Sequence, residues 1–297
     1  MTAELKGELD DLLSHAKSKA ELKRERDEAI AALEREGYMV HKPGPPVEDT
    51  LDFDTSKIRG KRVRIAVISD THMGSKQQQI THLNAFAAYA KECKVDAVLH
   101  GGDMTDGPPQ MHPGHLHNLF LQTYDAQRSY AIANLPAFGK TPVYAISGNH
   151  DESWLKNNAG PIVPDICEGL GWNYVGQSAG YIRFGDVLIY LHHPHDGGAY
   201  ALSYKLQKRI EALSPENKPH IFLAGNYHKA VHLAAYRNVE GFLLPSYQAQ
   251  TPFMVSKGLP SVIGGVIIEF GIDNHGLAPS LKTEWVIQRM PVEEDYP

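Results

Sequence analysis

The segment RVRIAVISDTH, residues 62–72, joins a run of β-branched residues directly to a polar ending. Valine and isoleucine favour strands, so the first part of the segment predicts a β-strand. Two other segments have the same form: VDAVLHGGD, residues 95–103, and PVYAISGNHD, residues 142–151. Helix-like sequence lies between these segments, at about 81–92 and 115–134. This alternation predicts a sheet whose polar side chains gather at the carboxyl ends of its strands.

Strand-like segments become more frequent after residue 172, and a helix is expected over 199–213. Strand-rich sequence with helices at the outside predicts two sheets packed together and flanked by helices. We therefore expect an α/β fold, a four-layer α-β-β-α sandwich of two mixed sheets with an N-terminal helical extension. The expected strands of this half are 172–176, 179–184, 186–193, 220–225, 241–245, 264–270 and 283–288.

Composition divides the chain into three parts. Residues 1–40 are rich in Ala, Leu, Glu and Lys at helical spacing, which predicts a helical extension. Residues 41–60 include HKPGPPVEDT, whose prolines and glycine predict a linker. Residues 61–297 form the main domain, where the candidate functional residues lie.

The N-terminal helices have three interpretations that the sequence leaves open. Leu5, Leu9, Leu12 and Ala16 form one apolar stripe. The stripe could pack on its own subunit, form a short coiled coil that makes a homo-oligomer through residues 1–38, or bind another partner.

Charge and composition exclude several classes of protein. The chain has 297 residues and a net charge of -6, which argues against a basic nucleic-acid footprint over the whole surface. It has no apolar run near the roughly 18 residues of a membrane span, and its N-terminus is charged, so we expect a cytoplasmic protein with no membrane partner. Cys93 and Cys167 make no disulfide framework. The 16 histidines matter more, because imidazole is a common ligand of transition metals.

Metal-binding side chains follow five of the expected strands. They are Asp70 and His72, then Asp103, then Asn149, His150 and Asp151, then His192, His193 and His195, and last Asn226 and His228. Carboxylate and imidazole together suit Mn, Fe or Zn. Two such ions about 3.5–4 Å apart can act on the attacking and leaving oxygens of a phosphoryl group, and a shared carboxylate can hold them. Asp70 and His72 could reach one ion together, because residues i and i+2 share one side of a strand.

Each short motif alone is weak, but their order along the chain is specific. The combination resembles the calcineurin-like metallophosphoesterases, whose signature is D-x-H, then G-D, then G-N-H-D/E, then H, then G-H-x-H. The resemblance covers about residues 62–270 and implies metal-dependent hydrolysis of phosphoric esters. Within the family, ISDTHMG and VYAISGNHD are most similar to the branch that contains the DNA-repair exonucleases.

The resemblance implies a role for each matching residue. The metal ligands would be Asp70, His72 and His228 for the first ion, Asn149, His192 and Asn226 for the second, and Asp103 for both. A water or hydroxide bridging the ions would be the nucleophile. His150 would face the leaving group as an acid or charge stabiliser, and Asp151 would orient the ring of His150.

The residues nearest the substrate are assigned less directly. We assign the metal ligand to His192 because it ends the expected strand DVLIYL, and we assign His193 and His195 to substrate binding. An exposed loop position is the alternative for His195. Tyr227 would point away from the ions, where it could stack on a substrate base or pack in the core. The loop PPQMHPGHLHN, 108–118, is either part of the substrate rim or a rigid surface loop.

Position 226 departs from the family pattern, which has histidine there. An asparagine oxygen can bind a metal, but it is a harder and neutral donor, so Asn226 predicts weaker occupancy of the second site by Mn, Fe or Zn. A natural specialisation, an engineered replacement and a loss of catalysis would each explain it. The otherwise intact signature argues against loss of catalysis. The similar shape of the two side chains slightly favours an engineered replacement.

These observations predict a phosphodiesterase with two divalent ions, for which Mn is preferred and Fe or Zn are the alternatives. Its substrate would be a nucleotide, a cyclic nucleotide or a nucleic-acid end, and the acidic charge disfavours a long duplex. The alternatives are a phosphomonoesterase or phosphoprotein phosphatase, and a catalytically impaired metal-binding scaffold. The intact pair His150 and Asp151 argues against the scaffold, which would need no acid for a leaving group.

Overall fold

The structure is a computed structural model that describes residues 50–58, 60–272 and 280–297, together with Arg24, Glu28, Ala32 and Arg35. It divides into two units, Met1–Pro45 and Pro46–Pro297. In the first unit, the four described residues are helical and exposed. The prediction of self-association through residues 1–38 otherwise lies outside the described residues.

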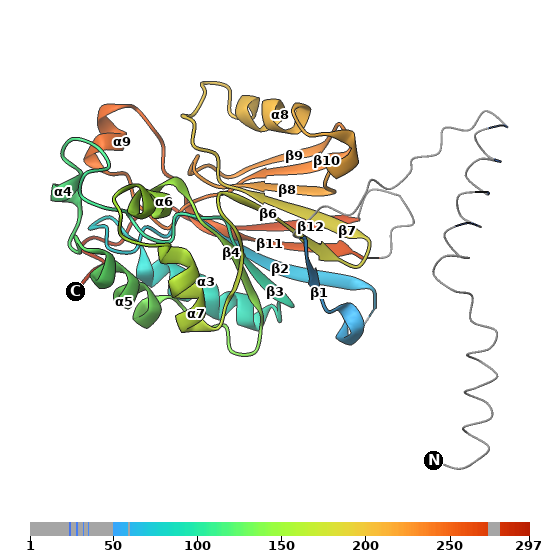
Figure 1. Ribbon diagram of the computed structural model, residues 1–297, viewed down its shortest axis with the longest axis horizontal. Helices are drawn as coiled ribbons and strands as arrows, with labels where there is room; N and C mark the ends of the chain where they lie inside the picture. The colour runs from blue at the N-terminus through green and yellow to red at the C-terminus, as the bar shows by residue number, and fades with distance from the viewer. Residues whose placement is uncertain are drawn as a thin grey trace, which may run out of the picture. The chain divides into compact units, whose positions relative to one another are not determined.

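Two mixed sheets of six strands each form the centre of the second unit (Figure 1). Sheet A contains, in spatial order, β1 (Thr50–Phe53), β6 (Ala179–Phe184), β7 (Val187–His192), β8 (Ile221–Ala224), β10 (Val239–Leu243) and β9 (Val231–Tyr236). Sheet B contains β12 (Leu281–Gln288), β11 (Ile263–Gly271), β2 (Arg62–Ile68), β3 (Ala97–His100), β4 (Val143–Ile146) and β5 (Asn173–Gly176). Strands β2 to β5 are parallel neighbours in sheet B, as are β7, β8 and β10 in sheet A.

Among the described residues of this unit, seven α-helices lie around the sheets. They are α3 (Ile80–Glu92), α4 (His115–Asn118), α5 (Tyr124–Asn134), α6 (Asn149–Lys156), α7 (Ile162–Leu170), α8 (Tyr204–Glu211) and α9 (Pro252–Ser256). Figure 1 shows α8 against the outer face of sheet A, and α3, α5 and α7 against the outer face of sheet B.

Three apolar clusters separate four layers, which confirms the expected sandwich. Between the sheets, Ile65 and Leu99 of sheet B pack with residues such as Ile189 of sheet A. On the outer face of sheet B, Ile68 belongs to a cluster with residues of α3, α5 and α7. On the outer face of sheet A, Leu206 and Ile210 of α8 pack against Phe222 and its neighbours. Burial of alternate residues on both faces explains why the central strands read as continuous apolar runs.

The expected helix over 115–134 is interrupted. One turn, α4, ends at Asn118, and α5 begins only at Tyr124. Between them the backbone pairs with the loop after β2, because the amide of Lys76 donates to the carbonyl of Asn118 (2.8 Å) and the amide of Phe120 to that of Gly74 (3.0 Å). These tertiary hydrogen bonds replace the helical ones. Thr123 then caps α5 by accepting a hydrogen bond from the amide of Ala126 (3.3 Å).

Some elements were not expected from the sequence. Strand β1 lies within the range expected to be a linker, 41–60, and pairs in parallel with β6. Strand β9 and helices α6, α7 and α9 were also missed. Within the described part of the chain, helices long and apolar enough to cross a membrane are absent.

Candidate metal centre

Five loops bring most of the expected ligands together at the carboxyl ends of β2, β3, β4, β7 and β8. Asp70, His72 and His228 form the first cluster, which we call group I; they come from the loops after β2 and β8 and are all buried. Nε2 of His228 lies 3.2 Å from Oδ1 of Asp70 and 3.3 Å from Nε2 of His72. Their ligand atoms lie within 4.8 Å of one another, close enough to bind one ion.

The second cluster, group II, consists of Asp103, Asn149 and His193. Nε2 of His193 lies 3.0 Å from Oδ2 of Asp103 and 3.2 Å from Oδ1 of Asn149. Asp103 lies between the two groups, since the same Oδ2 atom is 3.9 Å from Nε2 of His72. This position is the one required of a carboxylate shared by two ions.

His192, the expected ligand, does not face the centre. Its ring stacks on Tyr190 and Phe222, with centroids 5.6 and 5.8 Å away, on the side of sheet A that α8 covers. Burial lowers the pKa of His192 to about 4. Because side chains alternate along a strand, His193 takes the opposite face, the one shared by Val187, Ile189 and Leu191. The assignment of the ligand to His192 was wrong, and the alternation of the strand could have identified His193.

Five residues of the centre have a left-handed backbone. They are Asp70 (φ 53°), His72 (45°), Asp103 (52°), Asn226 (70°) and His228 (50°). Asp70 and His72 therefore do not converge as alternate residues of an extended strand; they lie beyond the end of β2 and turn inward. Non-glycine residues rarely adopt this conformation, which costs on the order of 1–3 kcal/mol each and tends to concentrate at functional sites. The strain indicates that the geometry of the centre serves function.

Two glycines of the expected motifs allow the ligands to approach closely. A Cβ atom at Gly148 would lie 2.1 Å from Oδ1 of Asp103. Gly102 has φ +93°, and a Cβ atom there would lie 2.5 Å from Nδ1 of His193. Any side chain at either position would displace group II.

Negative charge dominates the electrostatics of the centre. Burial opposes ionisation of Asp103, but the neighbouring histidines, His193 first, hold its pKa below the usual range. Burial likewise opposes protonation of His193, but the carboxylates of Asp103 and Asp70 raise its pKa to about 10. Buried carboxylates this close together require compensating positive charge, which protons or metal cations can supply. The donor set therefore fits divalent cations.

His150 lies beside both groups. Its ring packs edge-on against that of His72, with centroids 4.7 Å apart, and its amide donates to Oδ1 of Asp103 (2.8 Å). Nδ1 of the ring lies 2.8 Å from the carbonyl oxygen of Asp106, so it carries the proton and donates. Nε2 is then the ring atom that remains for proton exchange with a substrate.

Asp151 does not orient the ring of His150, contrary to expectation. Its carboxylate accepts hydrogen bonds from the amides of Met104 (3.0 Å), Thr105 (2.9 Å) and Gly148 (2.9 Å). It therefore fixes the loop that carries Asp103. Burial, and then the charge of Asp103, raise the pKa of Asp151 to about 6.

Asp106 was not predicted as a residue of the centre. Its Oδ1 accepts hydrogen bonds from Nδ1 of His72 (2.8 Å) and from Nε2 of Gln248 (3.0 Å), while its carbonyl holds His150. The bond to His72 leaves Nε2 of that ring for a metal. The signal was a second carboxylate three residues after Asp103 in GGDMTDG.

Two expected substrate residues, His195 and Tyr227, make hydrogen bonds to residues outside groups I and II. Nε2 of His195 lies 2.9 Å from Oγ of Ser178 and 3.5 Å from a carboxylate oxygen of Glu152. Tyr227 packs in the cluster beneath α8, and its hydroxyl donates to Oδ1 of Asp196 (2.6 Å). Tyr227 also borders the cleft described below, whereas His195 does not.

A model of the calcineurin-like phosphoesterase family matches residues 63–194, which include Asp70, Asp103, Asn149 and His193. Over these residues the chain is similar to the calcineurin-like phosphoesterases. Among curated proteins, the comparison found no significant match.

Solved structures from several organisms match the chain at low sequence identity. A novel archaeal phosphodiesterase is 13% identical, with 76% of this chain and 100% of that chain covered and a TM-score of 0.45. The phosphoesterase YfcE from E. coli is 14% identical, and the match covers 75% of this chain and 98% of that chain with a TM-score of 0.41. Vps29 from Chaetomium thermophilum is 13% identical, and the match covers 78% of this chain and 100% of that chain with a TM-score of 0.41.

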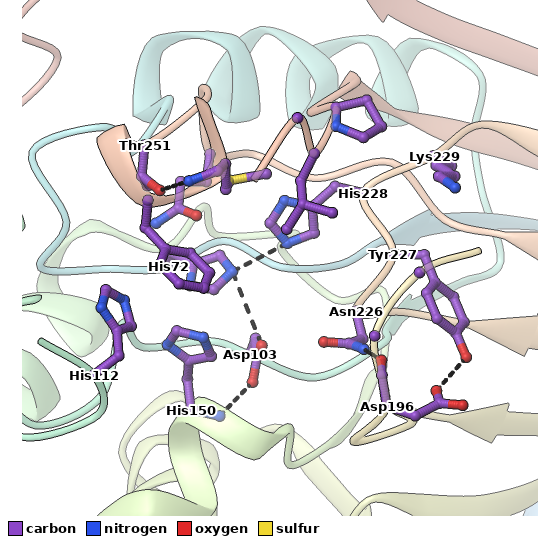
Figure 2. A pocket seen from close by; sticks show the side chains of 18 of the residues that line it. His72, Asp103, His112, His150, Asp196, Asn226, Tyr227, His228, Lys229 and Thr251 are labelled. Atoms are coloured by element: carbon purple, nitrogen blue, oxygen red, sulfur yellow. Dashed lines mark hydrogen bonds and ion pairs between the residues drawn. The ribbon is translucent and has the colours of Figure 1, made fainter. Parts of the chain in front are cut away.

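Asn226 occupies the position where the signature of the phosphoesterase family has histidine. Its side-chain nitrogen Nδ2 donates to the carbonyl oxygen of Asp196 (2.8 Å), and its backbone amide donates to Oδ1 of Asp70 (3.1 Å). Figure 2 shows the amide oxygen turned to the side of Asp103 and His150. The hydrogen bond to Asp196 thus holds the side chain with its amide oxygen toward the centre.

A cleft of about 420 Å³ opens over the candidate metal centre. His72, Asp103, His150 and His228 form part of its lining, so these four residues can be reached from the cleft (Figure 2). The volume lies in the range of small-molecule sites.

Proposed function

We propose that this chain is a phosphodiesterase that uses two divalent cations to hydrolyse a nucleotide, a cyclic nucleotide or a nucleic-acid end. The observation that carries the proposal is the position of Asp103 between group I and group II. A shared carboxylate is the simplest way to hold two ions at the spacing that phosphoryl chemistry uses.

The residues that would hold the ions are those of group I for the first and those of group II with Asn226 for the second. Mixed oxygen and imidazole donors suit Mn²⁺, Fe or Zn²⁺, and we propose Mn²⁺ because carboxylate and amide oxygens are numerous here. When bound, the ions would supply Lewis acidity and lower the pKa of the attacking water.

His150 would act on the leaving group. Its Nδ1 proton is fixed by the carbonyl of Asp106, so Nε2 would deliver a proton to the leaving oxygen or stabilise its charge. Asp151 would contribute indirectly, because it holds the loop of Asp103.

We further propose that Asn226 makes the second ion the weaker-bound one. A neutral amide oxygen is a poorer donor for Mn, Fe or Zn than imidazole. Nδ2 of Asn226 donates a hydrogen bond to the carbonyl oxygen of Asp196. Because the surrounding chain accommodates the asparagine in this way, we favour a natural specialisation of the site over an engineered replacement.

The substrate would be small or single-stranded. The chain has a net charge of -6, and Lys229 is the one lysine or arginine among the described residues that line the cleft. A long duplex depends on many lysine and arginine contacts to phosphates, so this surface does not favour it.

Hydrolysis of bis-p-nitrophenyl phosphate with added Mn²⁺ tests the proposal, with the wild type and Asn226→His compared. We expect Mn²⁺-dependent turnover by both, and less Mn²⁺ needed by Asn226→His. Turnover of p-nitrophenyl phosphate without turnover of the diester would instead support the phosphomonoesterase. No turnover of either ester by either protein would support the metal-binding scaffold.

A further inference from the structure

One wall of the cleft is aromatic and exposed. The ring of His112 stacks on that of Phe253, with centroids 4.4 Å apart and planes at 25°. Both residues line the cleft, and Phe253 remains 39% exposed. A ligand ring placed on this wall would stack on aromatic surface that is otherwise open to water.

The wall is fixed in place before any ligand binds. Pro252 begins α9, and Oγ1 of Thr251 caps the helix by accepting a hydrogen bond from the amide of Met254 (3.2 Å). Behind Phe253, Met254 is buried. A preformed wall of this kind orders few side chains on binding, so little entropy opposes its use as a ring-binding surface.

The cleft is also asymmetric. Figure 2 shows His112 and Lys229 on opposite sides of Asp103 and His72. Lys229 is largely buried, and its Nζ donates to the carbonyl of Ala199 (3.3 Å) and makes no ion pair with any described residue. A phosphoryl group at the metal centre would therefore have an aromatic surface on one side and a positive charge on the other.

We infer that the wall formed by His112 and Phe253 is a subsite for a flat aromatic ring of the substrate, as in a mononucleotide or a short nucleotide ester. Stacking of a base on an aromatic side chain tolerates any base and contributes substantially to affinity. The inference rests on the proposed function, because it requires a phosphoryl group at the metal centre.

Two phosphonates provide a matched pair of probes. 9-(2-phosphonomethoxyethyl)adenine and ethoxymethylphosphonate share the phosphonate and the ether chain, and only the first carries a ring. Neither contains a phosphoric ester bond to hydrolyse. Calorimetric titration of both into the Mn²⁺-loaded protein measures the contribution of the ring directly.

We expect the wild type to bind the adenine compound about tenfold more tightly than ethoxymethylphosphonate. Phe253→Ala should reduce this ratio to near one without weakening ethoxymethylphosphonate, and Phe253→Leu should give an intermediate ratio. Val255→Ala is the control, because Val255 lies on the same helix, is 62% exposed and does not line the cleft. It should retain the full ratio.

Equal affinity for the two compounds in the wild type would overturn the inference, and so would a ratio that survives in Phe253→Ala. Either result leaves the proposed function standing, since the phosphonate group is still bound. If neither compound binds the Mn²⁺-loaded protein, the phosphoesterase function itself fails.

Discussion

Group I and group II lie side by side but are built differently. Group I has only carboxylate and imidazole donors, and each of its residues is buried. Group II, with the adjacent Asn226, includes two neutral amides, and both asparagines are partly exposed. Under the proposed function, this contrast in donors predicts that group I binds its ion more tightly than group II with Asn226.

The largest effect should come from the residue that joins the groups. Asp103→Asn removes the shared charge, so kcat/KM for bis-p-nitrophenyl phosphate should fall on the order of a thousandfold. Initial rates at saturating Mn²⁺ measure it. Asp186→Asn is the control, because Asp186 is exposed, and it should have no effect. A loss of less than tenfold in Asp103→Asn would show that the two groups act separately.

The next effect separates two adjacent histidines. His193→Ala should lower kcat/KM about a hundredfold by removing a donor of group II. His192→Ala should change it less than about threefold, because that ring packs beneath α8. The same assay compares both variants, after circular dichroism shows that each is folded. Equal losses would contradict the assignment of His193 to the centre.

A smaller effect concerns the difference in donors itself. Asn226→His should tighten the weaker Mn²⁺ site about tenfold and leave the tighter site unchanged. Equilibrium dialysis against Mn²⁺ resolves the two sites without any assay of activity. If the substitution weakened binding instead, the amide held by Asp196 would be the better ligand in this site.

The fold and group I were predictable because they depend on local patterns. Apolar runs located the strands of both sheets except β1 and β9, and Asp70, His72 and His228 follow such runs. The choice between His192 and His193 failed because both follow the same run; it depends on which face of β7 meets the other sheet. Alternation along Val187, Ile189 and Leu191 carries that information.

Other features could not be predicted because they depend on tertiary contacts. The break between α4 and α5 arises from backbone hydrogen bonds to the loop after β2. The role of Asp106 appears only when His72 and His150 lie on either side of it. The aromatic wall joins His112 to Phe253, which are distant in sequence.

The smallest expected effect is on stability and concerns Glu269, which lies outside both groups. Hydrogen bonds from Arg64 and Arg62 lower the pKa of Glu269 from 4.5 to about 2. Its stabilising contribution is therefore present above pH 4.5 and lost as the pH falls toward 2. Glu269→Gln should lower the free energy of unfolding by about 1 kcal/mol or less at pH 7, since the pair is partly exposed.

Urea denaturation at several pH values measures the effect of Glu269→Gln. Its difference from the wild type should shrink as the pH is lowered from 4.5, whereas the exposed control Glu216→Gln should show little difference at any pH. A difference that is constant with pH would mean that the glutamate stabilises by packing rather than by charge.

The central claim is that two ions of unequal affinity act together on a phosphodiester. Bound Mn²⁺ and turnover of bis-p-nitrophenyl phosphate, measured in the same samples over a Mn²⁺ titration, test it most directly. We predict two bound ions per chain and turnover that rises only as the second, weaker site fills. Full turnover with one ion bound, or two ions bound without turnover, would contradict the account.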